Sequence, residues 1–281
     1  MTTNPGGRIV VAYDGSPDAM TALTWAVRTA IMTGQPVAAV VATAADDLLP
    51  HRSLLRGEHL DEVRASAERI LGEPLLGHTV VELRAGPAVP VLLEASVDAS
   101  LLVVGSLGHG QVAGSLAGSV SQHLARHAPC PVVVARPAAH PGATRIVVGV
   151  DGSGGSDAAL DFACTRAEAT GEDVVVIHGW RDGRATGTTR REVPAEFMDR
   201  IEEEERLLAE SVTGLRNDHP DVRVVPEAIP VVAWRALADA SAAASLVVVG
   251  SRGRGAFSGM LLGSVSQQVL RHAQCPVAVV R

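Results

Sequence analysis

The feature that most constrains the fold is an internal repeat that spans almost the whole chain. Three segments of the first half return in the second half: RIVVAYDGS (8–16, returning at 145–153), LLVVGSLGHG (101–110, returning at 246–255) and GSVSQHLARHAPCPVVVAR (118–136, returning at 263–281). A repeat of this length is a duplicated domain rather than a solenoid unit. The 281 residues therefore predict two domains, at 1–137 and 144–281, joined by a short linker rich in Pro, Ala and Gly.

Each half alternates short apolar runs, rich in Val, with segments of helical periodicity. The apolar runs predict buried strands at Ile9–Tyr13, Val37–Val41, Thr79–Leu83, Leu101–Val104 and Val132–Ala135, and again at 146–150, 174–178, 222–226, 246–249 and 277–280. Helices are predicted at 18–33, 55–72, 89–97 and 118–127, with a longer middle helix at 195–214 in the second half. This order predicts an α/β, Rossmann-like fold in each half: a five-stranded, mostly parallel sheet with helices on both faces.

A glycine-patterned loop follows the fourth strand of each half. It reads Gly-x-x-Gly, a nine-residue spacer and Gly-Ser, at Gly105, Gly108, Gly118 and Ser119 and again at Gly250, Gly253, Gly263 and Ser264. Gly105 and Gly108 predict a turn with positive φ and a close approach of backbone N–H groups to a ligand. Gly118 is expected to open a helix whose free N–H groups favour an anion, while Ser119 either caps that helix or binds a phosphate oxygen. The pattern therefore predicts a cradle for a di- or triphosphate.

Composition narrows the class of protein further. The chain contains no lysine, since all 24 of its basic residues are Arg, so neither a Walker-loop lysine nor a Schiff-base lysine can exist. A net charge of −7 with only 2% aromatic residues gives neither the basic field nor the stacking platforms that nucleic-acid binding needs. The apolar runs are too short for a membrane span, and the three cysteines form no C-x-x-C pair. We expect a cytoplasmic protein without a membrane partner, with buried free thiols and without a metal centre.

The two glycine motifs, with an aspartate after each first strand, resemble those of ATP-binding universal stress proteins. The resemblance covers nearly all of both halves, and in that family the G-x-x-G-(nine)-G-[S/T] motif holds the phosphates and ribose. It implies further binding positions in each half: Asp14 and Asp151 near the nucleotide, the backbone of Ala42 and Gly179 at the adenine edge, and the backbone of Val120 and Val265 at the phosphates. The implied ligand is ATP, with or without Mg²⁺.

The two halves are not identical around the loop. The second half has Arg252 and Arg254 where the first has Leu107 and His109. Arginine beside a polyphosphate forms charge-assisted hydrogen bonds, so we expect tighter ATP binding in the second half. Only the first half has Gly86-Pro87, which resembles a family feature lining the adenosine pocket.

Two functions remain open at the level of sequence. The resemblance implies a nucleotide-dependent regulatory module in stress response or growth arrest, and the alternative is a slow Mg²⁺-dependent ATPase. Hydrolysis needs groups that position water and stabilise charge, and Asp14, Asp151 and a Mg²⁺ ion could supply part of this. No general base or arginine finger stands out in the first half, so the binding module is favoured and no catalytic or metal-ligating residue is predicted. The segment 153–157 is similar to the SGGxDS loop of ATP-cleaving hydrolases, but a Gly/Ser turn that caps a helix is the favoured interpretation. The repeat also predicts an internal pseudo-dimer of the two halves, and whole chains could pair as a homodimer.

Overall fold

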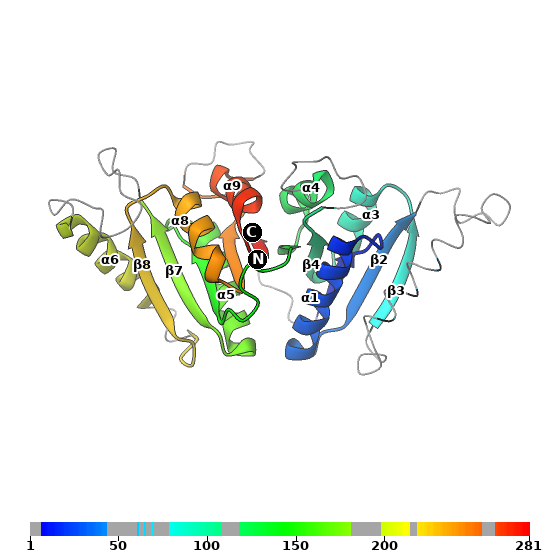
Figure 1. The fold of residues 1–281 in the computed structure, drawn as a ribbon, viewed down its shortest axis with the longest axis horizontal. Coiled ribbons are helices and arrows are strands. Elements are labelled where there is room, and N and C mark those ends of the chain that lie inside the picture. The colour runs from blue at the N-terminus through cyan, green and yellow to red at the C-terminus, as the bar shows by residue number, and fades with distance from the viewer. Residues whose placement is uncertain are drawn as a thin grey trace. The chain divides into compact units, whose positions relative to one another are not determined.

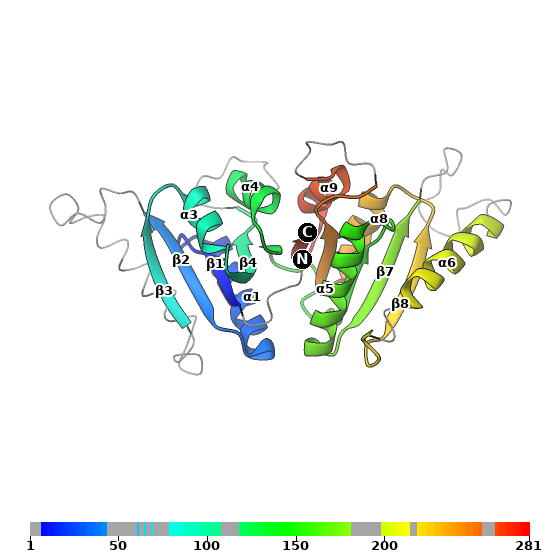
Figure 2. The ribbon, with the colours of Figure 1, turned by 180° about the vertical axis from the view of Figure 1, so that it is seen from behind.

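The computed structural model describes residues 7–43, 79–107, 118–180, 198–213, 218–254 and 262–281, with the single positions 61, 65 and 69. The chain divides into two compact units, Met1–Arg136 and Pro137–Arg281. Each unit is one parallel sheet with helices on both faces, as predicted (Figure 1). The view from behind shows the opposite faces of the same two sheets (Figure 2).

The first unit orders its strands β3-β2-β1-β4-β5. Its elements are β1 (Arg8–Ala12), α1 (Pro17–Thr33), β2 (Val37–Thr43), β3 (Thr79–Ala85), α3 (Ala88–Ala95), β4 (Ala99–Gly105), α4 (Ser119–His127) and β5 (Val132–Ala135). All the strand pairs described within this unit are parallel. The strand order reverses between β1 and β4, and ligands bind sheets of this kind outside the carboxyl ends at such a reversal.

The second unit repeats this plan in the order β10-β9-β6-β7-β8. Its elements are β6 (Arg145–Gly149), α5 (Gly154–Thr170), β7 (Asp173–Gly179), α6 (Met198–Thr213), β8 (Val224–Ile229), α8 (Ala233–Ala240), the 3-10 turn η5 (Ser241–Ala243), β9 (Leu246–Gly250), α9 (Ser264–His272) and β10 (Val277–Val280). Here the strand order reverses between β6 and β9, which pair in parallel. α5 lies on one face of the sheet and α8 and α9 on the other (Figures 1 and 2).

The first helix of each unit shows how the local sequence fixes an element. Ser16 is the N-cap of α1 and its side chain accepts a hydrogen bond from the Ala19 N–H, while Ser153 does the same for α5. Both helices end at a glycine in the left-handed region, Gly34 (φ 69°) and Gly171 (φ 72°). The favoured interpretation of segment 153–157 is therefore confirmed, because this segment caps a helix.

The predicted strands are confirmed, with small shifts at their ends. The largest shift is at β8, which begins at Val224 rather than at Val222, because the Val222 N–H bonds the His219 carbonyl in the preceding turn at 3.2 Å. The apolar runs are strands because both faces of each sheet are covered, and the interior residues of β1, β4, β6 and β9 are fully or almost fully buried. The predicted helix at 55–72 lies outside the described residues except at three positions.

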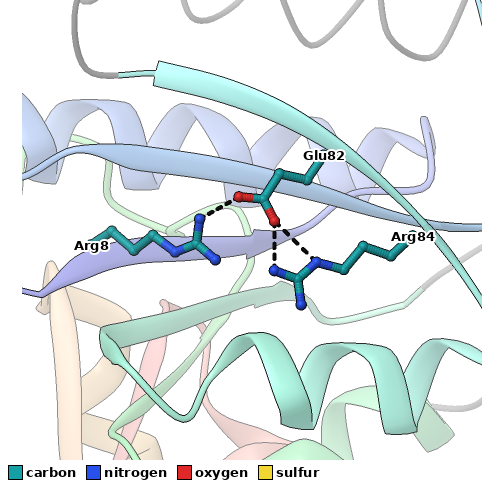
Figure 3. A network of polar contacts seen from close by, with 3 residues as sticks. All are labelled: Arg8, Glu82 and Arg84. Atoms are coloured by element: carbon teal, nitrogen blue, oxygen red, sulfur yellow. Dashed lines mark hydrogen bonds and ion pairs between the residues drawn. The ribbon is translucent and has the colours of Figure 1, made fainter.

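A charged network joins the outer strand of the first unit to its centre (Figure 3). Glu82 of β3 accepts hydrogen bonds from Arg8 of β1 and from Nε and Nη2 of Arg84, the latter two at 3.0 and 2.7 Å. Burial by itself would raise the pKa of Glu82, but the two guanidinium groups hold it below its ordinary value. Because β2 lies between β1 and β3, the network crosses β2 and fastens the outer strand β3 to β1.

The three cysteines are buried free thiols, as predicted. Within the described ranges, no helix is both long and apolar enough to cross a membrane. Nor do the described residues bring three His, Cys, Asp or Glu side chains together in an arrangement that could hold a metal ion.

A buried histidine couples the second unit to pH. His219 is 8% exposed, and its Nδ1 lies 2.8 Å from Oε1 of Glu168, while Nε2 lies 3.5 Å from Oδ1 of Asp161. Burial alone would lower the pKa of His219, but hydrogen bonding and charge from these two carboxylates outweigh it and raise the pKa. Burial raises the pKa of the Cys164 thiol to about 11, and the negative charges of the same two carboxylates add to this shift.

This arrangement predicts a pH-dependent stability of the second unit. The raised pKa means that protonated His219 stabilises the fold fully below its ordinary pKa of about 6.5, and that this contribution is lost as pH rises through the folded-state value. In a Trp25→Phe background, the remaining tryptophans report on the second unit alone. We expect His219→Gln to reduce the fall in the free energy of unfolding between about pH 5.5 and 8.5, measured by urea denaturation. His140→Gln, at an exposed position, is the control, and an unchanged pH profile in His219→Gln would contradict the assignment.

Candidate functional site

A cavity of about 350 Å³ lies at the carboxyl edge of the second sheet, where the strand order reverses. Its wall is built from the ends of β6, β7 and β9 and the loops and helix starts that follow them: Gly149, Val150, Asp151, Ser156, Ile177, Ala233, Leu237, Val249, Gly250, Arg252, Gly253, Gly263, Ser264, Val265 and Ser266. Small-molecule pockets have volumes of about 300–1,000 Å³, so this space suits a small ligand.

Three helices begin at this cavity, since Ser156 of α5, Ala233 of α8 and Ser264 of α9 all line it. The first N–H groups of a helix have no partner within the helix, and the positive end of its dipole lies there. No side chain caps α8 or α9, whose N-cap residues are Val232 and Gly263. The starts of α8 and α9 therefore present uncapped backbone donors at the positive ends of two helix dipoles, which suits an anion.

The residue that caps α4 and α9 differs from one sequence prediction. Gly118 and Gly263 occupy the N-cap positions, so Ser119 and Ser264 are the first residues of their helices and Ser119 does not act as a cap. The same backbone closure precedes both helices, because the N–H of Gly118 or Gly263 bonds the carbonyl of the serine after the fourth strand at 2.7 Å. Of the two roles predicted for Ser119, binding a phosphate oxygen is the one that stays open.

The loop glycines are needed for close packing rather than for positive φ. A Cβ on Gly105 would lie 2.7 Å from the backbone of Asp18, and a Cβ on Gly250 would lie 2.6 Å from the Gly155 carbonyl oxygen. Neither glycine adopts a positive φ, so that prediction was wrong for Gly105. Gly108 lies outside the described residues.

The positive φ angles occur instead in the turn after the first strand of each unit, at Gly15 (81°) and Gly152 (70°). These glycines follow Asp14 and Asp151, so the turn places an aspartate at the sheet edge, exposed at Asp14 and half-buried at Asp151. The chain therefore turns sharply before the first helix begins, and the glycine-patterned loop packs against that turn.

Asp151 joins the first-strand turn to the glycine loop. Its Oδ1 accepts hydrogen bonds from the N–H and Oγ of Ser153 at 3.1 and 2.6 Å, and its Oδ2 accepts the Arg254 N–H at 2.9 Å. A Cβ on Gly253 would lie 2.1 Å from Oδ2, so only glycine allows this approach. Burial would raise the pKa of Asp151, but the hydrogen bonds from Ser153 and the Arg254 N–H outweigh it and lower the pKa.

The two loop arginines of the second half lie differently. Arg252 is exposed and lines the cavity. Arg254 folds back over the first-strand turn, where its Nη2 lies 3.4 Å from the Gly152 carbonyl oxygen and 2.2 Å from the position that a Gly152 Cβ would occupy. Of the pair, Arg252 is thus the residue placed beside the cavity.

A model of the universal stress protein family matches residues 7–136 and again residues 142–281. The chain belongs to the universal stress protein family. It is 37% identical over 291 aligned residues to universal stress protein Rv2623 of Mycobacterium tuberculosis, an alignment that covers 97% of this chain and 96% of that protein. It is also 35% identical over 306 residues to universal stress protein Rv1996 of the same organism, covering 99% and 96% of the two chains.

The fold of the universal stress proteins is equally evident from a solved structure. A universal stress protein from Archaeoglobus fulgidus aligns with a TM-score of 0.67 over 98% of this chain and 96% of that one. Sequence identity in this alignment is 22%, so it speaks for the architecture alone.

In the first universal stress protein unit, the predicted binding residues gather at the corresponding sheet edge. Gly105 ends β4, Gly118 precedes α4, and Val120 lies in the first turn of that helix. Asp14 is exposed after β1, and its Oδ1 accepts the Ser16 N–H at 3.0 Å. Nucleotide binding by these residues stays a prediction.

The two predicted adenine-edge positions lie near the ends of the second strands. Ala42 lies opposite Arg84 in the β2–β3 register, one residue before β2 ends. Gly179 ends β7, where a Cβ would lie 2.4 Å from Cα of Ala233, itself a residue that lines the cavity. Gly179 thus brings the start of α8 close to the sheet, and its contact with adenine stays a prediction.

Sequence reasoning missed several residues that shape these edges. Ser266 Oγ donates to the Gly250 carbonyl at 2.6 Å, and Ser121 Oγ donates to the Gly118 carbonyl at 2.9 Å. The repeated string GSVSQ was a signal for this second serine of each motif. Leu237, which forms part of the apolar wall, had no signal beyond helical periodicity.

We predict that Gly179→Ala lowers stability, whereas Gly154→Ala does not. The new methyl group at 179 meets the backbone of Ala233, so the free energy of unfolding falls by about 1–3 kcal/mol. At Gly154, in the first turn of α5, nothing lies within 4 Å of the added Cβ, and alanine leaves stability unchanged or raises it by up to about 1 kcal/mol. Urea denaturation followed by tryptophan fluorescence measures both, and equal effects of the two substitutions would contradict the packing argument.

Proposed function

We propose that this universal stress protein is an adenine-nucleotide-binding regulatory module, and that ATP binds at the carboxyl edge of its second unit. The observation that supports this most is the convergence of the starts of α5, α8 and α9 on one cavity beside the glycine loop. Uncapped helix starts favour phosphate groups, and the absence of lysine from the chain leaves the backbone and Arg as the donors.

The residues around the cavity fit such a ligand. The N–H groups of Ser264 and Val265 at the start of α9, the Ser264 hydroxyl and the Arg252 guanidinium would hold the phosphates. The side chains of Ile177 and Leu237 provide an apolar wall on which a base can pack.

The state of Asp151 favours binding over hydrolysis. Both of its carboxylate oxygens accept hydrogen bonds from the protein, and its pKa lies below the ordinary value. A general base works best with a pKa near the operating pH, so this carboxylate is better suited to ordering the loop than to taking a proton from water. ATP occupancy would then act by stabilising one arrangement of the loop at 250–254 for a partner to recognise.

The proposed site predicts a specific loss of ATP binding in Gly263→Glu. Gly263 has φ −67° and ψ 157°, which any residue adopts, and a Cβ there finds nothing closer than 3.5 Å. The added carboxylate would lie at the start of α9, so we expect ATP affinity at this site to fall at least about tenfold. Isothermal titration calorimetry measures this, with Gly263→Ala as the uncharged control that changes affinity less than about twofold.

The matching variant in the first unit is Gly118→Glu, where a Cβ would lie 3.3 Å from the Ser106 carbonyl oxygen. Because Arg252 has no basic counterpart at Leu107, we expect Gly118→Glu to remove less ATP binding than Gly263→Glu does. Equal or greater loss in Gly118→Glu would overturn the ranking of the two units. ATP binding that survives unchanged in both variants, or no ATP binding by the parent protein, would overturn the proposed function.

The remaining alternative, a slow Mg²⁺-dependent ATPase, is tested by phosphate release. We expect the purified chain with ATP and Mg²⁺ to release phosphate at the same rate as Asp151→Ala, because Asp151 orders the loop and does not accept a proton. Release well above background that Asp151→Ala abolishes, while ATP binding is retained, would instead establish hydrolysis.

A further inference from the structure

We infer that Asp18 makes the first unit select adenine ligands with few phosphate groups, an inference that rests on the proposed nucleotide-binding function. Asp18 lies in the first turn of α1 and is half-buried. Its Oδ2 accepts a hydrogen bond from the Leu107 N–H at 2.8 Å and from the Ser106 hydroxyl at 3.3 Å. These two residues are the pair between Gly105 and Gly108 in the glycine motif, so a carboxylate already occupies the loop that is predicted to receive phosphate.

The second unit is built differently at the same place. The repeat aligns Asp18 with Gly155, and a Cβ on Gly155 would lie 2.5 Å from the Arg252 carbonyl oxygen. The loop therefore packs directly on the helix backbone, and no side chain can enter between them. Among the described residues, none accepts a hydrogen bond from the Arg252 N–H, the counterpart of the Leu107 N–H. This part of the structure therefore leaves that donor for a ligand, and Arg252, which also lines the cavity, carries a positive charge.

The two arrangements favour ligands of different charge. In the first unit a fixed carboxylate lies within the loop and a leucine replaces the arginine, so each added phosphate group meets a like charge. Two like charges about 4 Å apart weaken binding at least about fivefold even when water screens them. An adenine nucleoside or monophosphate avoids most of this repulsion, whereas ATP carries its charge toward the loop.

A purely structural role for Asp18 makes a different prediction. An acidic residue in the first turn of a helix stabilises that helix through its dipole, and its removal would then lower stability without changing which ligand is preferred. The ratio of ATP affinity to AMP affinity therefore separates the two roles. Asp18→Asn is the informative change, because its amide oxygen can still accept the Leu107 N–H while the charge is removed.

The experiment uses the full chain carrying Gly263→Glu, so that the first unit supplies the binding that is measured. Calorimetric titrations with ATP, ADP and AMP in EDTA compare the Gly263→Glu chain with the same chain that also carries Asp18→Asn. Urea denaturation checks the stability of both proteins. We expect Asp18→Asn to raise ATP affinity at least about fivefold, ADP affinity less, and AMP affinity less than about twofold. Asp98→Asn, an exposed charge at the opposite edge of the same sheet, is the control and should leave all three affinities unchanged.

The outcomes separate this inference from the proposed function. If the parent chain binds ATP and Gly263→Glu removes the binding at the second unit, the proposed function stands. An ATP-to-AMP affinity ratio that Asp18→Asn then leaves unchanged overturns the role of Asp18 alone. Repeating the titrations with Mg²⁺ tests another role for the carboxylate. If Asp18→Asn then weakens ATP binding, Asp18 holds a cation for the phosphates and the inference is overturned. If the parent chain binds no adenine nucleotide, both proposals fall.

Discussion

The candidate site of each unit depends on the close approach between the first turn of the first helix and the end of the fourth strand. In the second unit this contact joins Gly250 to Gly155, and in the first it joins Gly105 to Asp18. Contacts this short exclude a Cβ at the strand end, and they bring the turn after the first strand against the glycine loop. Because the strand end packs directly against the first helix, the aspartate after the first strand, the glycine loop and the helix starts all lie at the same edge of the sheet.

The same frame leads to two different electrostatic outcomes. In the second unit Asp151, which follows the first strand, holds the loop through the Arg254 N–H, and the helix side of the loop has no side chain because residue 155 is glycine. In the first unit a side chain does reach the loop from the helix, and it carries a negative charge. The two units therefore share one backbone arrangement. They differ in the charge that a ligand meets, because the helix position that contacts the loop is Asp18 in the first unit and Gly155 in the second.

Much of the fold could be predicted because its signals are local. Valine-rich runs are strands buried on both faces, and Ser16 and Ser153 mark the starts of helices that end at glycine. The sequence placed the glycine motif correctly after the fourth strand, but the reason predicted for its first glycine was wrong. Sequence spacing shows where a Cβ is absent and does not show which neighbour approaches, so positive φ was assigned to Gly105 when the requirement is contact with the backbone of Asp18.

Side-chain direction is the part of the site that sequence could not supply. Arg252 and Arg254 are separated by one glycine, yet one lines the cavity and the other folds over Gly152, because the loop turns between them where Gly253 meets Asp151. Asp18 likewise reads as an ordinary acidic residue in a first helical turn, since the loop it contacts is far away in the chain. Charge at a phosphate site is decided by such long-range contacts, so two copies of one motif can share every glycine and still differ in the ligand they favour.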